Sequence, residues 1–188
     1  MLNNKEEIVE FIYIEMMDAF RTGQTNVGFW KQLQAPLFQC NIELKKNFGL
    51  RHNLTRAVLE KLFQNYCLLN YSSQHFKTQA FNYKDRPYWQ YCMINMKTKT
   101  DKLDFLKNKV FMYNNKIWDK FYPPNFSCCP GYVRALDMKE LNSLGLTVYE
   151  IDEFEHPFSN WAFNPGKTDI NQFIKKMIKK SIRLKKES

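Results

Sequence analysis

The cysteines are the first residues of this sequence whose type suggests a specific chemistry. They are Cys40, Cys67, Cys92, Cys128 and Cys129. The last two are adjacent, and adjacent thiolates cannot hold one metal ion as a Cys-x-x-Cys knuckle does, because the knuckle spacing lets both sulfurs face the ion. A zinc site there would need distant ligands such as Cys92 or His156. Buried free thiols are the favoured interpretation, and we expect neither a metal ion nor a cofactor.

Histidine is the second residue type that could support catalysis or metal binding. The chain has three, His52, His75 and His156, which lie far apart in the sequence. No serine or cysteine lies in a nucleophile elbow or a triad signature, so the motifs predict no catalytic residues. A triad assembled in space from distant residues stays open, although His156 is most simply a loop residue.

One acidic group could perform acid–base chemistry or ligate Mg²⁺. It consists of Asp152, Glu153 and Glu155. Neighbouring carboxylates are suited to both tasks, but a solvated loop end is the favoured interpretation. The chain has six glycines and no glycine-rich phosphate loop, so nucleotide hydrolysis is not expected.

A basic C-terminal segment is the strongest candidate for contact with a partner. Its cations lie opposite an apolar stripe from Ile170 to Ile178, and they are Lys175, Lys176, Lys179, Lys180, Arg183 and Lys186. The simplest interpretation is a helix packed on its own domain with a solvated outer face. Contact with DNA phosphates would be salt-sensitive, and a neighbouring protein or a membrane surface are further alternatives. Aromatic residues do not alternate with these lysines, so base stacking is not supported.

The composition predicts an ordered, basic protein. Of the 188 residues, 44% are hydrophobic and 16% are aromatic, which is enough apolar surface to offset the ordering entropy of folding. The net charge of +9 and the isoelectric point of about 9.2 favour an acidic partner. Nucleic acid, an anionic membrane and an acidic protein surface all fit this description.

The cysteine usage and the N-terminal residues favour a reducing compartment. An odd number of cysteines without regular spacing is not typical of a secreted disulfide scaffold. Charged residues such as Glu6 and Glu7 interrupt the uniform apolar stretch that a signal peptide requires. No segment approaches the roughly 20 apolar residues of a membrane span. We expect a soluble protein made inside a cell.

Helical periodicity dominates the N-terminal region. It predicts a helix over 8–20 closed by Gly23, and a second helical stretch over 26–47 that Pro36 interrupts and Gly49 ends. Asn53 is predicted to cap a longer helix. The apolar face of that helix contains Leu54, Val58, Leu62, Phe63, Tyr66 and Leu69.

The pattern changes near Pro87, where short aromatic or β-branched runs alternate with turn-forming residues. These runs predict strands over 88–94, 109–113, 132–136 and 147–151, with a helix over 138–144 that stops at Gly145. The predicted fold is α+β, with a mainly helical N-terminal half, a small mixed β-sheet region and a basic C-terminal helix. The predicted regions are 1–84, 85–157 and 158–188.

Four pieces of the middle third agree in order and spacing with the conserved portion of a known family. They are Arg86-Pro87-Tyr88-Trp89-Gln90-Tyr91, Leu106-Lys107-Asn108-Lys109-Val110-Phe111, Ile117-Trp118-Asp119-Lys120-Phe121-Tyr122-Pro123-Pro124-Asn125, and Val133-Arg134-Ala135-Leu136 with Glu140-Leu141 and Gly145-Leu146 beyond it. Here the chain resembles the phage Mu F-like minor head proteins, also called phage head morphogenesis proteins. The preceding helices resemble the family loosely.

The chain departs from the family pattern at two places. Thr100 and Leu103 stand where the family usually has an Arg and a His. The positions of a family Cys-x-Cys correspond to Cys129 and Gly131, with Cys128 beside the first. Any metal or redox role of the usual residues is therefore in doubt, and the chain looks like a diverged or reduced member.

The double proline predicts a structural clasp. Pro123 and Pro124 fix two φ angles, so the segment from Trp118 to Cys128 is expected to be a stiff, extended connection that Trp118 and Tyr122 pin to the sheet. The residues predicted to form this structural motif are Arg86, Tyr88, Trp89, Tyr91, Trp118, Asp119, Tyr122, Pro123, Pro124, Asn125 and Arg134.

The resemblance implies a minor capsid protein of a bacteriophage or prophage that acts in head morphogenesis or DNA packaging by binding and is not an enzyme. Its partners would be portal or capsid proteins, with packaged DNA as a further contact of the basic helix. It would occur in the bacterial host cytoplasm during assembly and then in the virion head. The alternatives are a nuclease or toxin-type enzyme acting on nucleic acid, and an unrelated basic nucleic-acid-binding protein.

Overall fold

A computed structural model describes residues 4–48, 50–93, 101–150 and 155–186 of the chain. The chain divides into two compact units. The first unit comprises Met1–Cys67 and Asp169–Ser188, and the second comprises Leu68–Thr168. Helix α3 (Arg56–Phe81) contributes residues to both.

The first unit begins with helix α1 (Lys5–Arg21), which confirms the helix expected over 8–20. The Asn4 side chain caps it by accepting a hydrogen bond of 2.9 Å from the Glu7 backbone amide. Gly23 ends this stretch with a φ of +68°, a left-handed conformation that glycine adopts without strain. Ile8, Ile12 and other residues at helical spacing are buried.

Helix α2 (Asn26–Phe48) passes through Pro36 without a break, so the predicted interruption is wrong. Proline removes one helical hydrogen bond and crowds the preceding turn. Pro36 lies on the exposed side, while Leu33, Leu37 and Leu44 on the opposite side are buried. Because an unbroken helix keeps these apolar side chains on one face, their burial outweighs the local cost of the proline.

Helix α3 is capped by Thr55 and not by Asn53, which corrects the predicted cap. The Thr55 hydroxyl accepts from the Val58 amide at 3.4 Å. The Asn53 side chain instead accepts from the Arg183 amide at 2.6 Å. The predicted apolar face is largely buried, although Val58 is only half-buried and Leu59, which was not predicted, is fully buried.

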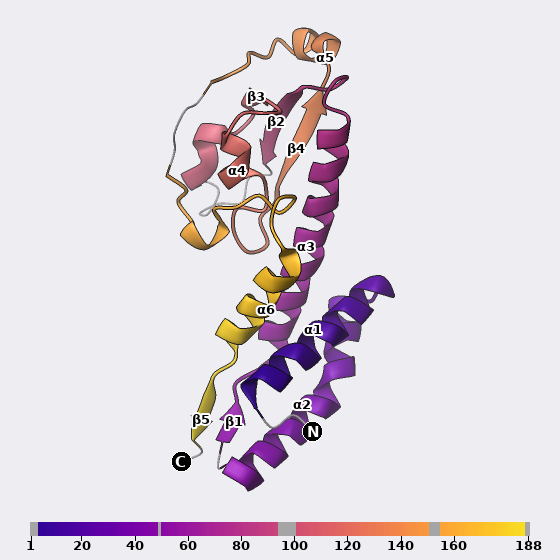
Figure 1. Ribbon diagram of the computed structural model, residues 1–188, viewed down its shortest axis with the longest axis vertical. Coiled ribbons are helices and arrows are strands. Elements are labelled where there is room, and N and C mark those ends of the chain that lie inside the picture. Colours follow the sequence, from indigo (N-terminus) through magenta and orange to yellow (C-terminus); the bar gives the residue numbers. More distant parts are fainter. Residues whose placement is uncertain (1–3, 49, 94–100, 151–154, 187–188) are drawn as a thin grey trace. The chain divides into compact units, whose positions relative to one another are not determined.

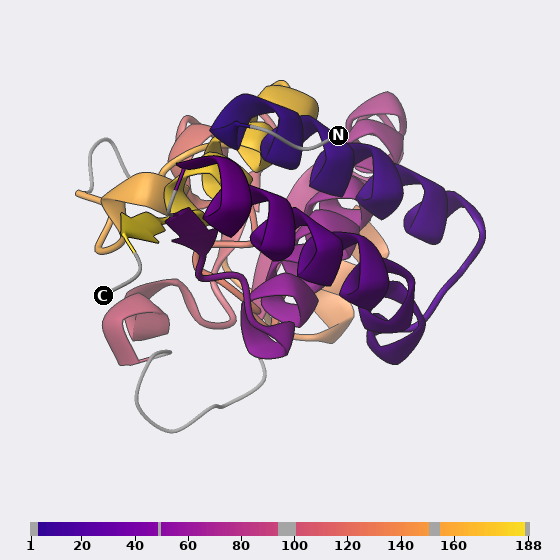
Figure 2. The same cartoon turned by 90° about the horizontal axis from the view of Figure 1, so that it is seen from below.

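Two short strands, β1 (Leu50–His52) and β5 (Leu184–Lys186), form an antiparallel sheet in the first unit that the sequence analysis did not predict. Helix α6 (Ile170–Ser181) precedes β5 in the chain, and its Asp169 cap accepts from the Gln172 amide at 3.1 Å. Figure 2 shows α6 beside α1, and β1 beside β5.

The second unit contains a three-stranded antiparallel sheet in the order β3-β2-β4 (Figure 1). Its strands are β2 (Tyr88–Met93), β3 (Val110–Met112) and β4 (Gly131–Leu136). A fourth strand was predicted over 147–151. Among its described residues, Val148 forms a single parallel bridge to Val110, and Ile151 lies outside the described residues.

Short helices fill the connections of the second unit. Helix α4 (Ile117–Phe121) replaces the first part of the connection that was expected to be extended, because burial of Ile117, Trp118 and Phe121 on one side favours a helical turn. Helix α5 (Met138–Ser143) has a capping box between Asp137 and Glu140, as well as Gly145 at a φ of +60°. Two 3₁₀ helices, η1 and η2, cover Asp101–Leu106 and Ser159–Trp161.

The fold class is α+β, as predicted. Three N-terminal helices precede a small antiparallel sheet and a C-terminal helix. None of the helices in the described ranges is long and apolar enough to cross a bilayer.

Candidate functional site

The inner face of the three-stranded sheet carries an aromatic core in the second unit. Trp89, Tyr91 and Phe111 from the strands are fully buried, and Trp118 and Tyr122 pack against them. The Trp118 ring nitrogen donates to the Met112 carbonyl at 2.9 Å. These contacts place Trp89, Tyr91, Trp118 and Tyr122 of the predicted motif in one cluster.

Asn125 lies at the centre of a buried hydrogen-bond network beside this core. It follows the cis peptide bond between Pro123 and Pro124 and is 0% exposed. Its side-chain nitrogen donates to the Tyr91 hydroxyl at 2.8 Å and to the Phe121 carbonyl at 3.1 Å. Its side-chain oxygen lies 2.9 Å from Nε2 of His156. The amide therefore connects β2, the end of α4 and the loop that contains His156.

The His156 ring is neutral and has both nitrogens engaged. Its Nδ1 accepts from the Phe158 amide at 3.0 Å, so Nε2 carries the proton and donates to Asn125. Burial lowers the pKa of His156 to about 4. The imidazole thus joins protein groups, and neither nitrogen has a lone pair directed at a metal ion or a substrate.

The adjacent thiols of Cys128 and Cys129 do not belong to a set of metal ligands among the described residues. Cys129 is buried, and burial raises its thiol pKa, whereas Cys128 is exposed. The Cys129 sulfur accepts from the Gly131 amide at 3.4 Å. Within the described ranges no group of three His, Cys, Asp or Glu side chains is placed to hold an ion. Asp152 and Glu153, the first two residues of the acidic group, lie outside those ranges.

A second hydrogen-bond network joins the part of α3 in this unit to β4. The Gln79 side chain donates to the Val133 carbonyl at 2.8 Å and accepts from the Tyr122 hydroxyl at 2.7 Å. Because the Tyr122 proton is used in that bond, the His75 Nδ1, which lies 3.3 Å from the hydroxyl oxygen, must be the donor of their contact. Burial lowers the pKa of His75 as well.

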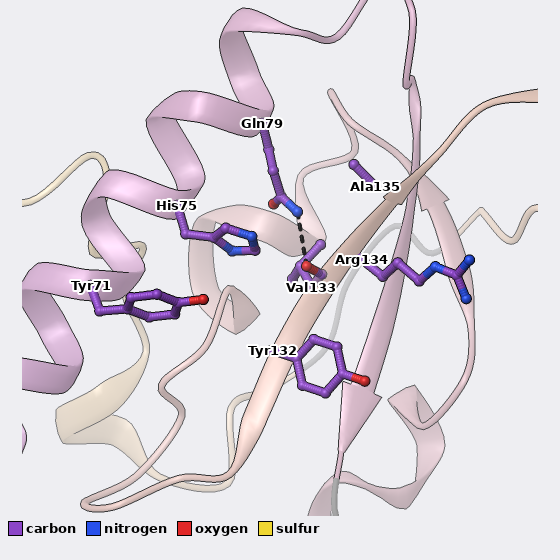
Figure 3. Close-up of a pocket in the computed structure, with 7 residues that line it drawn as sticks. All are labelled: Tyr71, His75, Gln79, Tyr132, Val133, Arg134 and Ala135. Atoms are coloured by element: carbon purple, nitrogen blue, oxygen red, sulfur yellow. Dashed lines mark hydrogen bonds between the residues drawn. The ribbon is translucent and has the colours of Figure 1, made fainter.

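An open pocket of about 390 Å³ lies over this network, between α3 and β4. Figure 3 shows Tyr71, His75 and Gln79 directed from the helix toward the strand that carries Tyr132. The Tyr71 and His75 rings stack with centroids 5.7 Å apart. Tyr71 and Tyr132 are 63% and 47% exposed, so the pocket presents two solvent-accessible aromatic side chains.

Two arginines of the predicted motif lie on the exposed side of β4 and share one carboxylate. Arg86 donates to the Ala135 carbonyl at 2.9 Å and to Glu140 at 2.8 Å. Arg134 lies 3.7 Å from the other Glu140 oxygen, which is a weaker contact. Glu140 also caps α5 by accepting from the Asp137 amide. One carboxylate therefore serves two guanidinium groups.

The segment before α6 packs against the aromatic core through contacts that the sequence analysis did not predict. Asn164 donates to the Trp118 carbonyl at 2.9 Å and accepts from the Gly166 amide at 2.8 Å. A Cβ at Gly166 would lie 2.2 Å from a ring carbon of Phe76, so only glycine fits there. Asp119, which is exposed, forms an ion pair of 2.6 Å with Lys167.

The basic residues of the C-terminal segment fall into two groups in the first unit. Lys175 pairs with Glu10 at 2.7 Å, and Lys179 pairs with Glu6 at 2.8 Å. The Lys175 ammonium also lies 4.5 Å from the centre of the Tyr13 ring. Both ion pairs therefore link α6 to α1 at the surface of the first unit.

The other group is directed toward solvent. Lys176, Lys180 and Arg183 are exposed and have no ion pair with a described residue. The backbone of Lys186 lies in β5, while its side chain lies outside the described ones.

The structure thus separates the predicted site residues into different surroundings. Six of them meet in or beside the buried core, namely Trp89, Tyr91, Trp118, Tyr122, Pro123 and Asn125, and Pro124 is buried next to them. Tyr88 packs on the opposite face of the sheet, with Val110 and Leu136. Sequence reasoning missed the roles of His75, Gln79 and His156, because single polar residues in a helix or loop have no periodicity that reveals a partner distant in sequence.

Comparison with known proteins finds two relatives of part of the chain. A segment of 83 residues, 44% of the chain, is 31% identical to the Mu-like prophage FluMu F protein of Haemophilus influenzae and covers 20% of that protein. A segment of 62 residues, 33% of the chain, is 39% identical to the putative capsid assembly protein F of Escherichia phage Mu and covers 14% of it.

The chain spans a fifth or less of the length of these curated relatives. No protein-family model matches it, and no solved structure matches it. The matches nevertheless agree on one kind of protein and are statistically significant. The chain is therefore homologous, over part of its length, to the F proteins of Mu-like phages and prophages.

Proposed function

We propose that the protein takes part in head assembly of a Mu-like phage or prophage by binding other head components. The observation that carries this proposal is the partial homology to a putative capsid assembly protein. The buried network supports a binding role, because Asn125 and His156 direct their polar atoms at each other and at neighbouring protein groups. In this proposal the second unit acts as a rigid scaffold and its surface makes the contacts.

Capsid or portal proteins are the proposed partners. The protein would be present in the host cytoplasm while heads form and in the virion head afterwards. Assembly contacts need complementary surfaces and no turnover, so the proposal assigns no catalytic residue. The accessible Tyr71, Tyr132 and Arg134 are residue types enriched at the centres of protein interfaces.

Packaged DNA is the proposed contact of the outward cations in α6 and just after it. Lys175 and Lys179 are engaged with glutamates, so the free set is Lys176, Lys180 and Arg183. Three phosphate contacts give a binding constant that falls with salt concentration with a logarithmic slope of about three. Contact with phosphates alone would show no preference for base sequence.

Head association is tested by co-expression of the chain with the capsid and portal proteins of its own phage or prophage. Heads are separated on a density gradient, and the chain is detected by immunoblot. We expect the chain in the head fractions at a fixed ratio to portal protein. A chain that stays at the top of the gradient in the presence of assembled heads overturns the proposal.

The DNA contact needs a variant that leaves α6 folded. Deletion of the segment would remove the buried Ile174 and Ile178, so the triple substitution Lys176→Gln, Lys180→Gln, Arg183→Gln is preferable. It should abolish most binding to a duplex oligonucleotide, while the matched substitution Lys61→Gln, Lys77→Gln, Lys84→Gln on exposed positions of and beside α3 should not. Cleavage of the duplex in the presence of Mg²⁺ would contradict the non-catalytic role.

A further inference from the structure

Helix α2 has an exposed apolar stripe on the side opposite to its buried leucines. The stripe consists of Ala35, Phe38 and Ile42, whose spacing of three and four residues places them on one face of the helix. Phe38 is 68% exposed and Ile42 is 46% exposed. A single exposed apolar residue is common, but an aligned series of this kind is typical of a surface on which a second helix packs.

Lysine residues bound this stripe at both ends. Lys31 lies one helical turn before it and Lys46 one turn after it, about 22 Å apart along the helix axis. Both are exposed, and neither forms an ion pair with a described residue. Glu43, the acidic residue of α2, is half-buried and accepts from the Gln39 side chain at 3.4 Å. The outer face of α2 is defined as Lys31, Ala35, Phe38, Ile42 and Lys46. It is apolar at its centre and positive at both ends.

This charge pattern selects one kind of occupant. In a parallel pair of two copies each lysine would meet its equivalent, and in an antiparallel pair Lys31 would meet Lys46, so both arrangements bring like charges together. A nucleic-acid backbone needs closely spaced cations, whereas the apolar stripe separates these two lysines. An amphipathic helix that has carboxylates at both ends of its own apolar stripe is complementary to the outer face in shape and in charge.

We propose that the outer face of α2 binds an amphipathic helix of another protein. Apolar side chains of that helix pack around Phe38, and its carboxylates lie beside Lys31 and Lys46. This inference deepens the proposed assembly role and rests on it only for the source of the helix, which a capsid or portal protein would present.

The charge preference is tested with the full chain and two fluorescein-labelled helical peptides that share one stripe of leucines. One peptide has glutamates at both ends of the stripe, and the other has lysines there. Fluorescence polarisation should show that the glutamate peptide binds at least about tenfold tighter. Lys31→Glu combined with Lys46→Glu should reverse this preference. Lys61→Glu combined with Lys77→Glu, an equal charge change at exposed positions of α3, should leave it intact.

The apolar contact requires its own variant. Phe38→Ala removes an exposed ring, so the fold should be kept, and circular dichroism checks this. Because an aromatic side chain at the centre of an interface contributes much of the binding energy, the glutamate peptide should bind about tenfold more weakly. Phe81→Ala is the matched control, since it removes an 86% exposed phenylalanine from α3, and it should leave binding unchanged.

The source of the helix is identified by cross-linking in assembled heads. The photo-reactive residue p-benzoylphenylalanine replaces Phe38, or Phe81 as the control, while the chain is co-expressed with the capsid and portal proteins. After illumination, mass spectrometry should find position 38 joined to a helix of one of these proteins that has acidic residues at both ends of its apolar stripe. Position 81 should not be joined to that helix.

Three results would overturn the assignment of the outer face of α2. The first is equal binding of the two peptides with no effect of Phe38→Ala. The second is a cross-link from position 38 to a second copy of the chain or to its own second unit. The third is binding to phosphatidylserine vesicles that is lost in Phe38→Ala while neither peptide binds, which would assign the face to a membrane surface.

Head association is measured separately on the density gradient, so the two proposals fail independently. A chain that sediments with heads but gives one of these three results loses only the assignment of the outer face. A chain that is absent from heads but still prefers the glutamate peptide through Phe38 loses only the assembly role.

Discussion

In the first unit, α6 is attached to α1 by an apolar stripe and by ion pairs at the surface, whereas the second unit surrounds a buried polar network with aromatic rings. Lys175 and Lys179 meet glutamates that remain half or more exposed. Asn125, in contrast, makes all its contacts away from water. Exposed ion pairs contribute little because water screens them, while a buried amide that loses its partners is costly.

The largest expected effect is that of Asn125→Ala. The substitution leaves the Tyr91 hydroxyl, the Phe121 carbonyl and the His156 Nε2–H unpaired inside the second unit. With about 1 to 3 kcal/mol for each unsatisfied group, we expect a loss of about 4 kcal/mol in the free energy of unfolding. Guanidinium denaturation followed by tryptophan fluorescence measures it.

The matched control for this change is Asn142→Ala on exposed α5, which should alter stability by less than about 0.5 kcal/mol. Equal effects of the two substitutions would show that the network around Asn125 contributes no more to the free energy of unfolding than an exposed amide does. The contrast between the buried network of the second unit and the exposed ion pairs of the first would then be wrong.

An intermediate effect is expected from pH. His156 has a pKa of about 4 in the folded protein and an ordinary value near 6.5 when unfolded. The unfolded chain therefore binds more protons between these values, so the contribution of the neutral ring is fully present above pH 6.5 and is lost as the pH falls toward 4. Between pH 7 and pH 5 the loss is on the order of 2 kcal/mol.

His156→Gln retains a donor for Asn125 but cannot titrate, so it should flatten this pH dependence in denaturation experiments at pH 7 and pH 5. Burial also lowers the pKa of His52 and His75, which leaves a smaller residual slope of the same sign. A slope identical to that of the unsubstituted protein would show that His156 is not the group responsible.

The smallest effect is expected from the double substitution Lys175→Gln, Lys179→Gln in the first unit. Its ion pairs with Glu10 and Glu6 are exposed, so the melting temperature should fall by no more than about 3 °C at low salt and by less at high salt. Differential scanning calorimetry at two salt concentrations provides the measurement. A salt-independent loss of more than about 10 °C would mean that these lysines, and not the isoleucine stripe, hold α6 in place.

Local patterns were sufficient to predict much of the fold. Helical spacing and the left-handed Gly23 and Gly145 define the ends of α1 and α5, because capping and periodicity are properties of neighbouring residues. The same reasoning failed at Pro36 and Asn53. There the local preference for a break or a cap is overridden by the buried face of α2 and by the contact of Asn53 with the Arg183 amide.

The candidate site was predictable to a lesser extent. The aromatic residues and Asn125 were singled out by composition and by the resemblance, but the partners His156 and Gln79 were not. The pairing of β1 with β5 could not be predicted either, because strands of three residues that are separated by most of the chain have no recognisable sequence pattern. Each of these contacts joins positions that only folding brings together.

The sequence by itself determined the α+β class, most helix and strand positions and the likeness to Mu-like F proteins. Periodicity, turn residues and the order of motifs are properties of the linear sequence, so they need no knowledge of tertiary contacts. Only the tertiary structure decided which polar groups form hydrogen bonds in the interior and which face solvent. That distinction depends on burial and hydrogen-bond geometry between distant residues, and it separates the paired Lys175 from the outward Lys176, and the interior Asn125 from the accessible Arg134.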